Sequence, residues 1–489
     1  MTKLRSQIKS GLLWSFINQG LGQVLFVVFN IYLSRLLGPS VFGTIGMVTI
    51  FSGFASLFID AGFGAAIIQK LNISQKELST IFWSNMLVGV ILYFIFFFSA
   101  EFIASFYKEK SLVLLTRVMT LSFVISAVSI VHSSILLKQL DFKRKTMINW
   151  LSILVSYAIA FALAFLGYGI WAMAAYILIN PLLSLILMWN LSKWRPSLHF
   201  STKEFKDLSR FGLNVLGDTT INYWSRNADN FLIGKYLGSF ELGIYSRAYA
   251  IMMLPMRNIS SVISNVMFPA FSTVQNDINV IKHYYIKTIK LVGLICFPLM
   301  IGLAALSYEF TSIFFGKEWL QMAEILRWLC ILAAFQSILS LNGIIYKSLG
   351  RADIAFKVSI MVSCVIIPAY AVGIYLDGLK GLVLAYFVSS TLLMVPIYHT
   401  ALKLINTSLF EIILCQKGIL ISVAVMAAVL ILIKFIAPFN HTILGFLLQI
   451  FIGVSVYITG IFFFEKDLIK KLLFKIFKYE PFKQLFSYF

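Results

Sequence analysis

Residues Met86–Ala100 read MLVGVILYFIFFFSA and contain no charged residue and no proline. With its flanks this run is long enough to cross the apolar core of a bilayer as an α-helix, which takes about 20 residues. Polar and apolar residues do not alternate along it, so it does not fit a strand of a membrane β-barrel. The run predicts a transmembrane helix.

The rest of the chain repeats this pattern. Of its 489 residues, 60% are hydrophobic and 12% are charged. A water-soluble core cannot hide so much apolar surface, so we expect an all-α polytopic membrane protein without a separate soluble domain. The fourteen predicted spans are about 11–35, 40–66, 80–105, 112–137, 146–167, 169–192, 211–236, 241–271, 285–307, 322–346, 353–376, 379–402, 412–437 and 441–464.

The basic residues predict how these spans are oriented. If the amino terminus is cytoplasmic, 28 of the 40 lysines and arginines fall on that side and nine on the other. Such an excess is typical of cytoplasmic loops, so both termini are expected to be cytoplasmic. The net charge of +20 lies in short loops rather than in one patch with aromatics, which favours anionic phospholipid over nucleic acid as a partner.

Sequence motifs of catalysis and metal binding are missing. The four cysteines are far apart, without a CxxC pair or a histidine-rich cluster, so neither a metal site nor a disulfide is predicted. GxxxxGK[ST], HExxH and GxSxG do not occur, so no catalytic residue and no cofactor is assigned. The sequence favours a protein that is not an enzyme.

A nine-residue pattern occurs twice. Arg35–Gly43 reads RLLGPSVFG and Lys235–Gly243 reads KYLGSFELG, so both copies fit [RK]-x-L-G-x-x-x-x-G at an offset of 200. Each copy follows the first span of a block of six, and blocks of even number start on the same side of the membrane. We therefore expect two six-helix lobes related by a pseudo-twofold axis along the membrane normal. The expected parts are lobes 1–198 and 199–405, two further spans in 406–465, and a basic amphipathic cytoplasmic tail, 466–489.

The seventh span carries charges in the stretch Asn222–Gly238, NYWSRNADNFLIGKYLG. A charge at the bilayer centre costs about 2.5–3.5 kcal/mol on insertion scales, whereas a leucine or isoleucine contributes only about 0.3–0.6. The polar face of this span must therefore line protein or water. On a helical wheel, about one third of the circumference holds Asn214, Asp218, Asn222, Ser225, Arg226 and Asp229.

Two interpretations of these charges stay open. Arg226 and Asp229, at positions i and i+3, can neutralise each other as a packing pair. Alternatively, Arg226 forms a cationic zone with Arg247 and Arg257 of the next span, where the guanidinium forks would bind phosphate or pyrophosphate. The candidate substrate-binding residues are Arg226, Arg247, Arg257, Asn222, Asp218 and Asp229.

These stretches resemble a known family. RLLGPSVFG, LGYGIWA at Leu166–Ala172 and NYWSRNADNFLIGKYLG are similar to the Wzx-type polysaccharide flippases of the multidrug/oligosaccharidyl-lipid/polysaccharide exporter superfamily, in particular its lipopolysaccharide and colanic acid exporter branch. The resemblance implies a fold like that of the multidrug exporters and flipping of undecaprenyl-pyrophosphate-linked oligosaccharide across a bacterial inner membrane by alternating access. It also implies H⁺ or Na⁺ coupling, a cavity lined by the charges of spans seven and eight, and glycosyltransferases and a polysaccharide polymerase as pathway neighbours. We expect a monomer.

Two alternative functions remain. A cation-coupled multidrug exporter has the same architecture, but such antiporters commonly carry a carboxylate in the first span, where this chain has only amides. A membrane polysaccharide polymerase or ligase usually needs a large external loop, and the longest outside connection here is about Tyr308–Gln321. Both alternatives are less favoured than the flippase.

Overall fold

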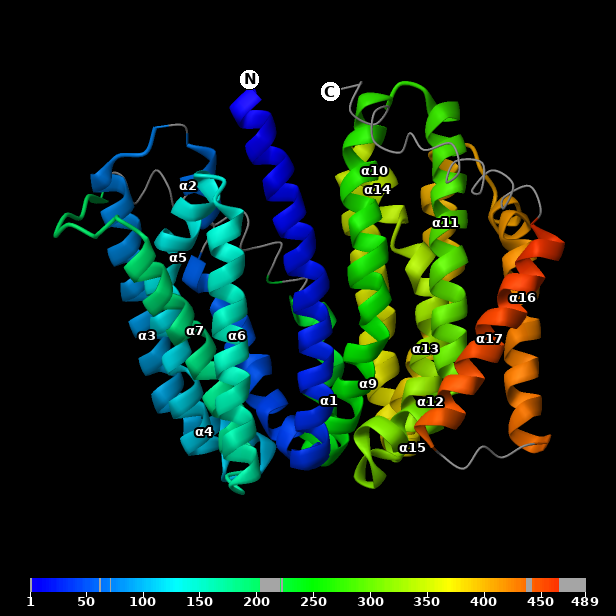
Figure 1. Cartoon of the computed structure of the whole chain (residues 1–489), viewed down its shortest axis with the longest axis horizontal. Coiled ribbons are helices and arrows are strands. Elements are labelled where there is room, and N and C mark those ends of the chain that lie inside the picture. The colour runs from blue at the N-terminus through cyan, green and yellow to red at the C-terminus, as the bar shows by residue number, and fades with distance from the viewer. Residues whose placement is uncertain are drawn as a thin grey trace. The chain divides into compact units, whose positions relative to one another are not determined.

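The computed structural model describes residues 2–60, 63–70, 72–202, 220, 223–436 and 442–465. Its described elements are helices, arranged in two compact units, Met1–Ser246 and Arg247–Phe489 (Figure 1). Ten of the described helices are long and apolar enough to cross a membrane. The expectation of an all-helical polytopic membrane protein is confirmed. The predicted tail, 466–489, and the candidate residues Asp218 and Asn222 lie outside the described residues.

The first unit begins with α1, Thr2–Asp60, which consists of two helical segments joined at Gly38. Gly38 has φ 71° and ψ 168°, a conformation that is accessible without a Cβ atom, and Pro39 then starts the second segment where its missing N–H is not needed. The other helices are α2 Phe63–Gln69, α3 Gln75–Tyr107, α4 Leu112–Met119, α5 Leu121–Lys138, α6 Phe142–Phe165, α7 Ile170–Leu191, a helix over 223–236, and the start of α9 Ser239–Pro255.

The two copies of the repeated motif lie against each other in the first unit. A Cβ atom on Gly43 would lie 1.6 Å from the carbonyl oxygen of Ser239, and one on Gly243 would lie 1.9 Å from that of Pro39. The contact is reciprocal, because each glycine of one copy meets the residue that starts the helix of the other. The backbones approach so closely that no side chain fits at either glycine. The sequence repeat is thus a physical contact between two helix N-termini.

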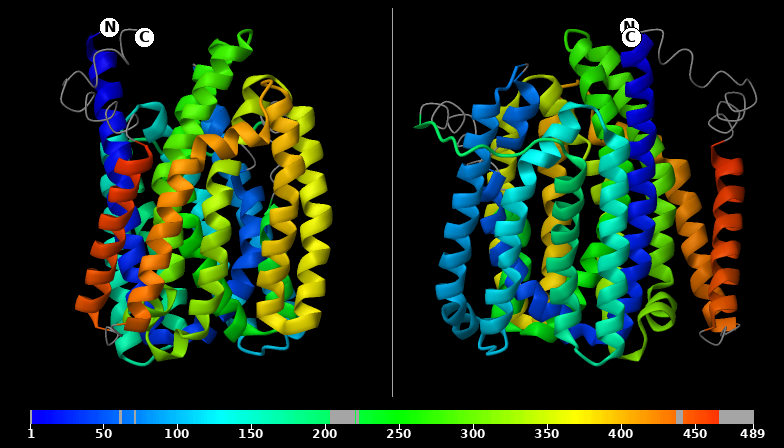
Figure 2. Two further views of the ribbon diagram at one scale, coloured as in Figure 1. Left: turned by 90° about the vertical axis from the view of Figure 1, so that its right-hand side faces the viewer. Right: turned by 60° about the vertical axis from the view of Figure 1, so that its left-hand side comes forward.

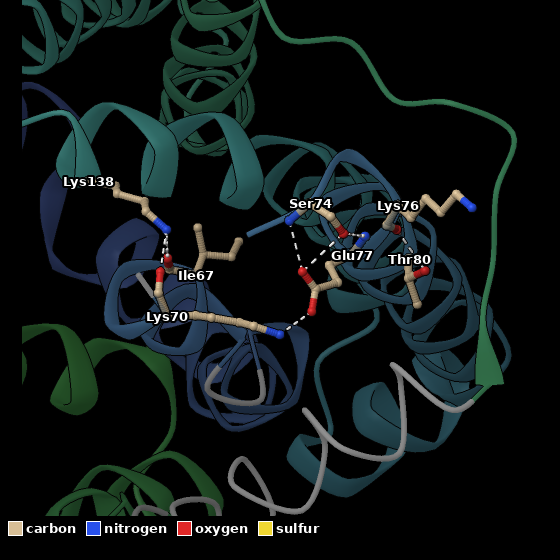
Figure 3. A network of polar contacts seen from close by, with 7 residues as sticks. All are labelled: Ile67, Lys70, Ser74, Lys76, Glu77, Thr80 and Lys138. Atoms are coloured by element: carbon tan, nitrogen blue, oxygen red, sulfur yellow. Dashed lines mark hydrogen bonds and ion pairs between the residues drawn. The ribbon is translucent and has the colours of Figure 1, made fainter. Parts of the chain in front are cut away.

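A polar network joins described residues between α2 and α3 (Figure 3). The side chain of Ser74 accepts a hydrogen bond from the Glu77 backbone, and Glu77 accepts one from the backbone of Ser74, which forms a capping box. Lys70 pairs with Glu77, and the Lys138 ammonium donates to the carbonyl of Ile67 at 3.0 Å. The Lys138 ammonium also donates to the carbonyl of Lys70, so the two lysines lie close together.

The second unit contains a helical hairpin in the middle of its longest helical element. In α15, Ala352–Lys403, Asp377 and Gly378 are not helical, and a Cβ atom on Gly373 would lie 2.4 Å from the carbonyl oxygen of Gly381. The chain reverses here, so α15 corresponds to two predicted spans. The unit also contains the end of α9, η1 Met256–Ser260, α10 Ser261–Thr273, α11 Ile278–Ala305, α12 Ser307–Phe310, η2 Thr311–Phe315, η3 Lys317–Trp319, α13 Gln321–Leu339, α14 Asn342–Ser348, α16 Leu409–Ile436 and α17 Ile443–Phe464.

Polar contacts at both ends connect the last two helices to α11 and α12 of the same unit. Lys290 of α11 pairs with Glu465, just after α17, at 2.6 Å, and Lys434 of α16 pairs with Glu309 of α12 at 2.6 Å. Between them, the Tyr457 hydroxyl donates to a backbone carbonyl of α11 at 2.8 Å. Figure 2 shows α16 and α17 side by side, in orange and red. The count of fourteen spans and the lobe boundaries at 198 and 405 stay predictions.

Candidate functional site

The helix over residues 223–236 packs one face against α1 and α3. Its Trp224 ring lies 5.3 Å from the ring of Phe54, and Phe231 lies 5.2 Å from Phe106. The ammonium of Lys235 donates to the carbonyl of Phe106 at 2.6 Å and lies over its ring. Three aromatic contacts and one charged hydrogen bond thus fix the rotation of this helix about its axis.

Arg226 points away from that packed face. At about 100° per residue it lies about 160° from Trp224 and about 180° from Lys235 around the helix. Its side chain is exposed, and none of the ion pairs between described residues involves it. The guanidinium of Arg226 is therefore available to a ligand.

Asp229, by contrast, is only 2% exposed. Its carboxylate accepts hydrogen bonds from the Tyr245 hydroxyl at 2.7 Å, from the Asn230 backbone N–H at 2.7 Å and from the Asn230 side chain at 3.2 Å. A buried carboxylate needs such donors, because without them its desolvation is costly. The pairing of Arg226 with Asp229 that the sequence left open is not formed in this part of the chain.

Tyr245 is the residue of this site that the sequence interpretation missed. It lies 16 positions after Asp229, on the far side of Gly238, whose φ of 90° permits the turn between the two helices. A helical hairpin brings residues at this separation together. The signal in the sequence was therefore the glycine of the second motif copy, combined with a polar residue on each flanking helix.

Arg257 lies in the π-helical turn η1, directly after Pro255, and its side chain is exposed. Proline lacks the N–H that continues an α-helical ladder. Within the turn, the side chain of Asn258 donates to the carbonyl of Leu254 at 2.9 Å. Single π-turns of this kind occur frequently at functional sites. Arg247, the third candidate arginine, is half-buried.

The candidate residues are divided between the two units. Arg226 and Asp229 belong to the first unit, on one helix, where Arg226 is exposed and Asp229 is buried, whereas Arg247 and Arg257 belong to the second. Among the residues that the structure describes, no group of three or more His, Cys, Asp and Glu side chains is placed to hold a metal ion. Exposed guanidinium groups of this kind can bind an anion.

Comparisons with known proteins agree on one family. Residues 32–324 match the family described as "Polysaccharide biosynthesis protein". The chain is 33% identical over 361 residues to the teichuronic acid biosynthesis protein TuaB of Bacillus subtilis, and the aligned region covers 73% of this chain and 74% of TuaB. It is 28% identical over 406 residues to the lipopolysaccharide biosynthesis protein WzxC of Escherichia coli, covering 82% of this chain and 80% of WzxC.

Solved structures show the same fold. The lipid II flippase MurJ in an inward closed conformation superposes with a TM-score of 0.75 at 18% identity, over 94% of this chain and 100% of that one. An inward-facing multidrug resistance transporter of the MATE family gives 0.61 at 16% identity, over 78% of this chain and 94% of the other. The fold is therefore MurJ- and MATE-like. The chain belongs to the polysaccharide biosynthesis family of Wzx-type flippases, within the multidrug/oligosaccharidyl-lipid/polysaccharide exporter superfamily, and is a multi-pass membrane transporter of polysaccharide biosynthesis.

Proposed function

We propose that the chain flips undecaprenyl-pyrophosphate-linked oligosaccharide repeat units from the cytoplasmic to the periplasmic leaflet of a bacterial inner membrane, for surface polysaccharide biosynthesis. The observation that carries this proposal is the exposed guanidinium of Arg226, which has no ion pair among the described residues. A cation within a membrane segment is expensive unless it meets water or an anion. The pyrophosphate of the cargo supplies that anion.

Arg257 supports the same assignment from the second unit. Its side chain is exposed on the π-turn that follows Pro255, within a predicted span. A planar guanidinium group binds phosphate oxygens bidentately, so each of these arginines suits a phosphate of the cargo. The other proposed members of the binding set are Arg247, Asn222, Asp218 and Asp229.

The proposed mechanism is alternating access between two six-helix lobes, 1–198 and 199–405, within fourteen spans. The reciprocal contact of Gly43 with Ser239 and of Gly243 with Pro39 supports this arrangement, because a pseudo-twofold axis relates such pairs. Residues 406–465 add two helices, and the basic tail 466–489 lies on anionic lipid at the cytoplasmic surface, where both termini are placed. Coupling to H⁺ or Na⁺ drives the cycle of a monomer. The process is transport and not catalysis, as for the transporters of this family.

Complementation of a deletion strain tests the arginines. We expect Arg226→Ala and Arg257→Ala each to reduce surface polysaccharide about tenfold or more at wild-type protein abundance, since a lost charge-assisted contact costs about 1.5–3 kcal/mol. The matched control is Arg117→Ala, because Arg117 is already paired with Glu101 at 3.2 Å and should be dispensable. Surface glycan is measured by immunoblot and protein abundance by an epitope tag.

Other outcomes distinguish the alternatives. Wild-type export by both arginine variants contradicts their role in cargo binding. Unaltered surface glycan after deletion, together with increased drug sensitivity, indicates a cation-coupled multidrug exporter instead.

A further inference from the structure

A short segment that follows α7 is bonded to the start of α3. This segment, residues 192–201, is not helical, and Figure 1 shows it in green beyond the end of α7; we call it the strap. The indole N–H of Trp194 donates to the Gln75 side chain at 2.6 Å, and the Gln75 amide donates to the carbonyl of Arg195 at 2.7 Å. The indole N–H of Trp83 donates to another strap carbonyl at 2.9 Å. Side-chain hydrogen bonds thus hold the strap against α3.

The strap lies against a buried histidine of α5. The side chain of His132 is fully buried, and neither of its ring nitrogens has a hydrogen-bond partner among the residues that the structure describes. Its ring lies 4.8 Å from that of Trp189 on α7 and 5.2 Å from that of Trp194 on the strap. Buried polar groups in proteins are nearly always hydrogen-bonded, so an imidazole with two unpaired nitrogens is unusual.

The surroundings of His132 are apolar and carry a positive charge. The two tryptophans pack on a cluster of buried side chains that consists of Phe63, Ile67, Leu78, Ile81, Phe82 and Val131. The guanidinium of Arg195 lies 5.3 Å from the centre of the Trp189 ring, which His132 also contacts. It is held there by donation to the carbonyl of Trp194 at 2.7 Å. An imidazolium at this place would have no solvent, no acceptor among the described residues and a like charge nearby, so the packing favours the neutral imidazole.

The other charged groups of the elements around His132 do not offset this charge. The acids at this end of the unit are Asp60, which accepts from the Gly64 N–H at 2.7 Å, Glu77, which pairs with Lys70, and Asp141, which pairs with Arg144 at 3.2 Å. The cations at the same end of α3, α5 and α6 are Lys76, Lys138, Lys143 and Lys145, and the strap also carries Lys193 and His199. No charged residue occurs in α7. Each of these acids is thus already bonded within the protein, and the excess charge on these elements is positive.

We propose that the strap is a latch that acid releases, because protonation of His132 undocks residues 192–201 from α3. The helices that pack on His132 are joined through buried apolar side chains, whereas the strap is held by hydrogen bonds that water can replace. The strap is therefore the part that moves away and lets water reach the imidazole. An exposed histidine is half protonated at about pH 6.5, so docking is complete above this pH and is lost progressively below it. The latch goes beyond the proposed transport and does not depend on its cargo.

Hydrogen–deuterium exchange of the purified full-length protein tests the latch. Exchange is measured at about pH 7.5 and about pH 5.5, on either side of the histidine titration, and is divided by the rate of an unstructured peptide at each pH. The reporter is the strap peptide with the Ser197 N–H, which donates to the Ser79 hydroxyl at 3.0 Å. We expect its corrected exchange to rise about tenfold at the lower pH, since the undocked fraction grows about tenfold for each pH unit below about 6.5. The turn between α6 and α7 at Gly167, which contains no histidine, should not change. An unchanged strap in the wild type overturns the proposal.

Variants of the two histidines identify the group that titrates. His132→Phe keeps an aromatic ring against both tryptophans but binds no proton, so its strap should stay protected at both pH values. His132→Leu is a second variant without the ring nitrogens, in case the larger phenylalanine disturbs the packing. The matched control is His199→Phe, which removes the histidine of the strap itself and should keep the full response. Loss of the response in the His199 variant, or its retention in both His132 variants, would overturn the proposal.

Discussion

The two copies of the repeated motif have the same backbone conformation at their glycines and differ in the side chains around them. Gly38 and Gly238 both have positive φ, 71° and 90°, and Gly43 and Gly243 meet in one reciprocal contact. At these positions the residue type follows from geometry, because a Cβ atom is either strained or has no space. Both copies therefore have glycine at the positions where the backbone conformation or the close contact leaves no room for a Cβ atom.

Upstream of the glycines the copies diverge. Phe29 stacks on a tyrosine ring, whereas Asp229, at the offset of 200, accepts a hydrogen bond from the hydroxyl of Tyr245. Arg35 is exposed, whereas Lys235 is half-buried and bonded to a carbonyl. Both halves of the repeat pack through aromatic rings, and the second adds a buried carboxylate and a lysine that are bonded within the protein.

The largest expected effect comes from breaking the feature that the copies share. Gly43→Ala places a methyl group 1.6 Å from a carbonyl oxygen, where ordinary contact begins at 3.4 Å, so the two helices must separate. We expect a loss of about 3 kcal/mol or more, at the upper end for overpacking. Thermal unfolding in detergent measures it. The control is Gly22→Ala, because a Cβ on Gly22 meets nothing within 4 Å; equal melting temperatures of the two variants would contradict the close contact.

The double substitution Gly43→Ala with Gly243→Ala sharpens the same comparison. A separation that accommodates one methyl group also makes room for the other, since both glycines belong to one contact. We expect the double variant to lose clearly less stability than the sum of the single variants. Additive losses would mean that the two glycines act independently.

Asp229→Ala should destabilise the protein by about 1–3 kcal/mol, because it leaves the buried Tyr245 hydroxyl without its acceptor. Asp229→Asn keeps an acceptor oxygen and should retain most of the stability. Thermal unfolding of both variants, compared with wild type, measures the difference. If asparagine is as damaging as alanine, the ionised carboxylate and not the hydrogen bond holds the two helices together.

Gly238→Ala forces an alanine to adopt a φ of 90° and should cost about 1–2 kcal/mol. Gly343→Ala is the matched control, because Gly343 lies within the helix α14 and a Cβ there meets nothing within 4 Å. The melting temperature should fall for the first variant and stay unchanged or rise for the second. A fall in both would point to a general intolerance of glycine substitution.

The smallest expected effect separates the two basic residues of the motif. Lys235→Met loses the hydrogen bond to Phe106 and should cost about 0.5–1.5 kcal/mol. Arg35→Met removes an exposed side chain and should change stability by less than about 0.5 kcal/mol. Unfolding curves of the two variants test this order. The reverse order would show that Arg35 supports the fold.

Much of the helical fold could be predicted because a helix that crosses a membrane needs a long apolar run, and such runs are visible in the sequence. Apolar runs locate the helices, and glycine and proline mark the bends at Gly38 and Gly378. Arg226 and Arg257 stand out because charges within apolar spans are expensive. The assignment of Asp218 and Asn222 to the site stays a prediction.

The sequence by itself determined the helical membrane fold, the positions of the repeated glycines and which charges demand an explanation, since these follow from local composition and spacing. Only the tertiary structure decided that Asp229 binds Tyr245 and not Arg226, that Arg257 lies on a π-turn, and that the two glycine pairs touch. Such choices depend on which helices become neighbours and how each is rotated about its axis. Rotation and neighbourhood are set by packing over the whole unit, and no local pattern encodes them.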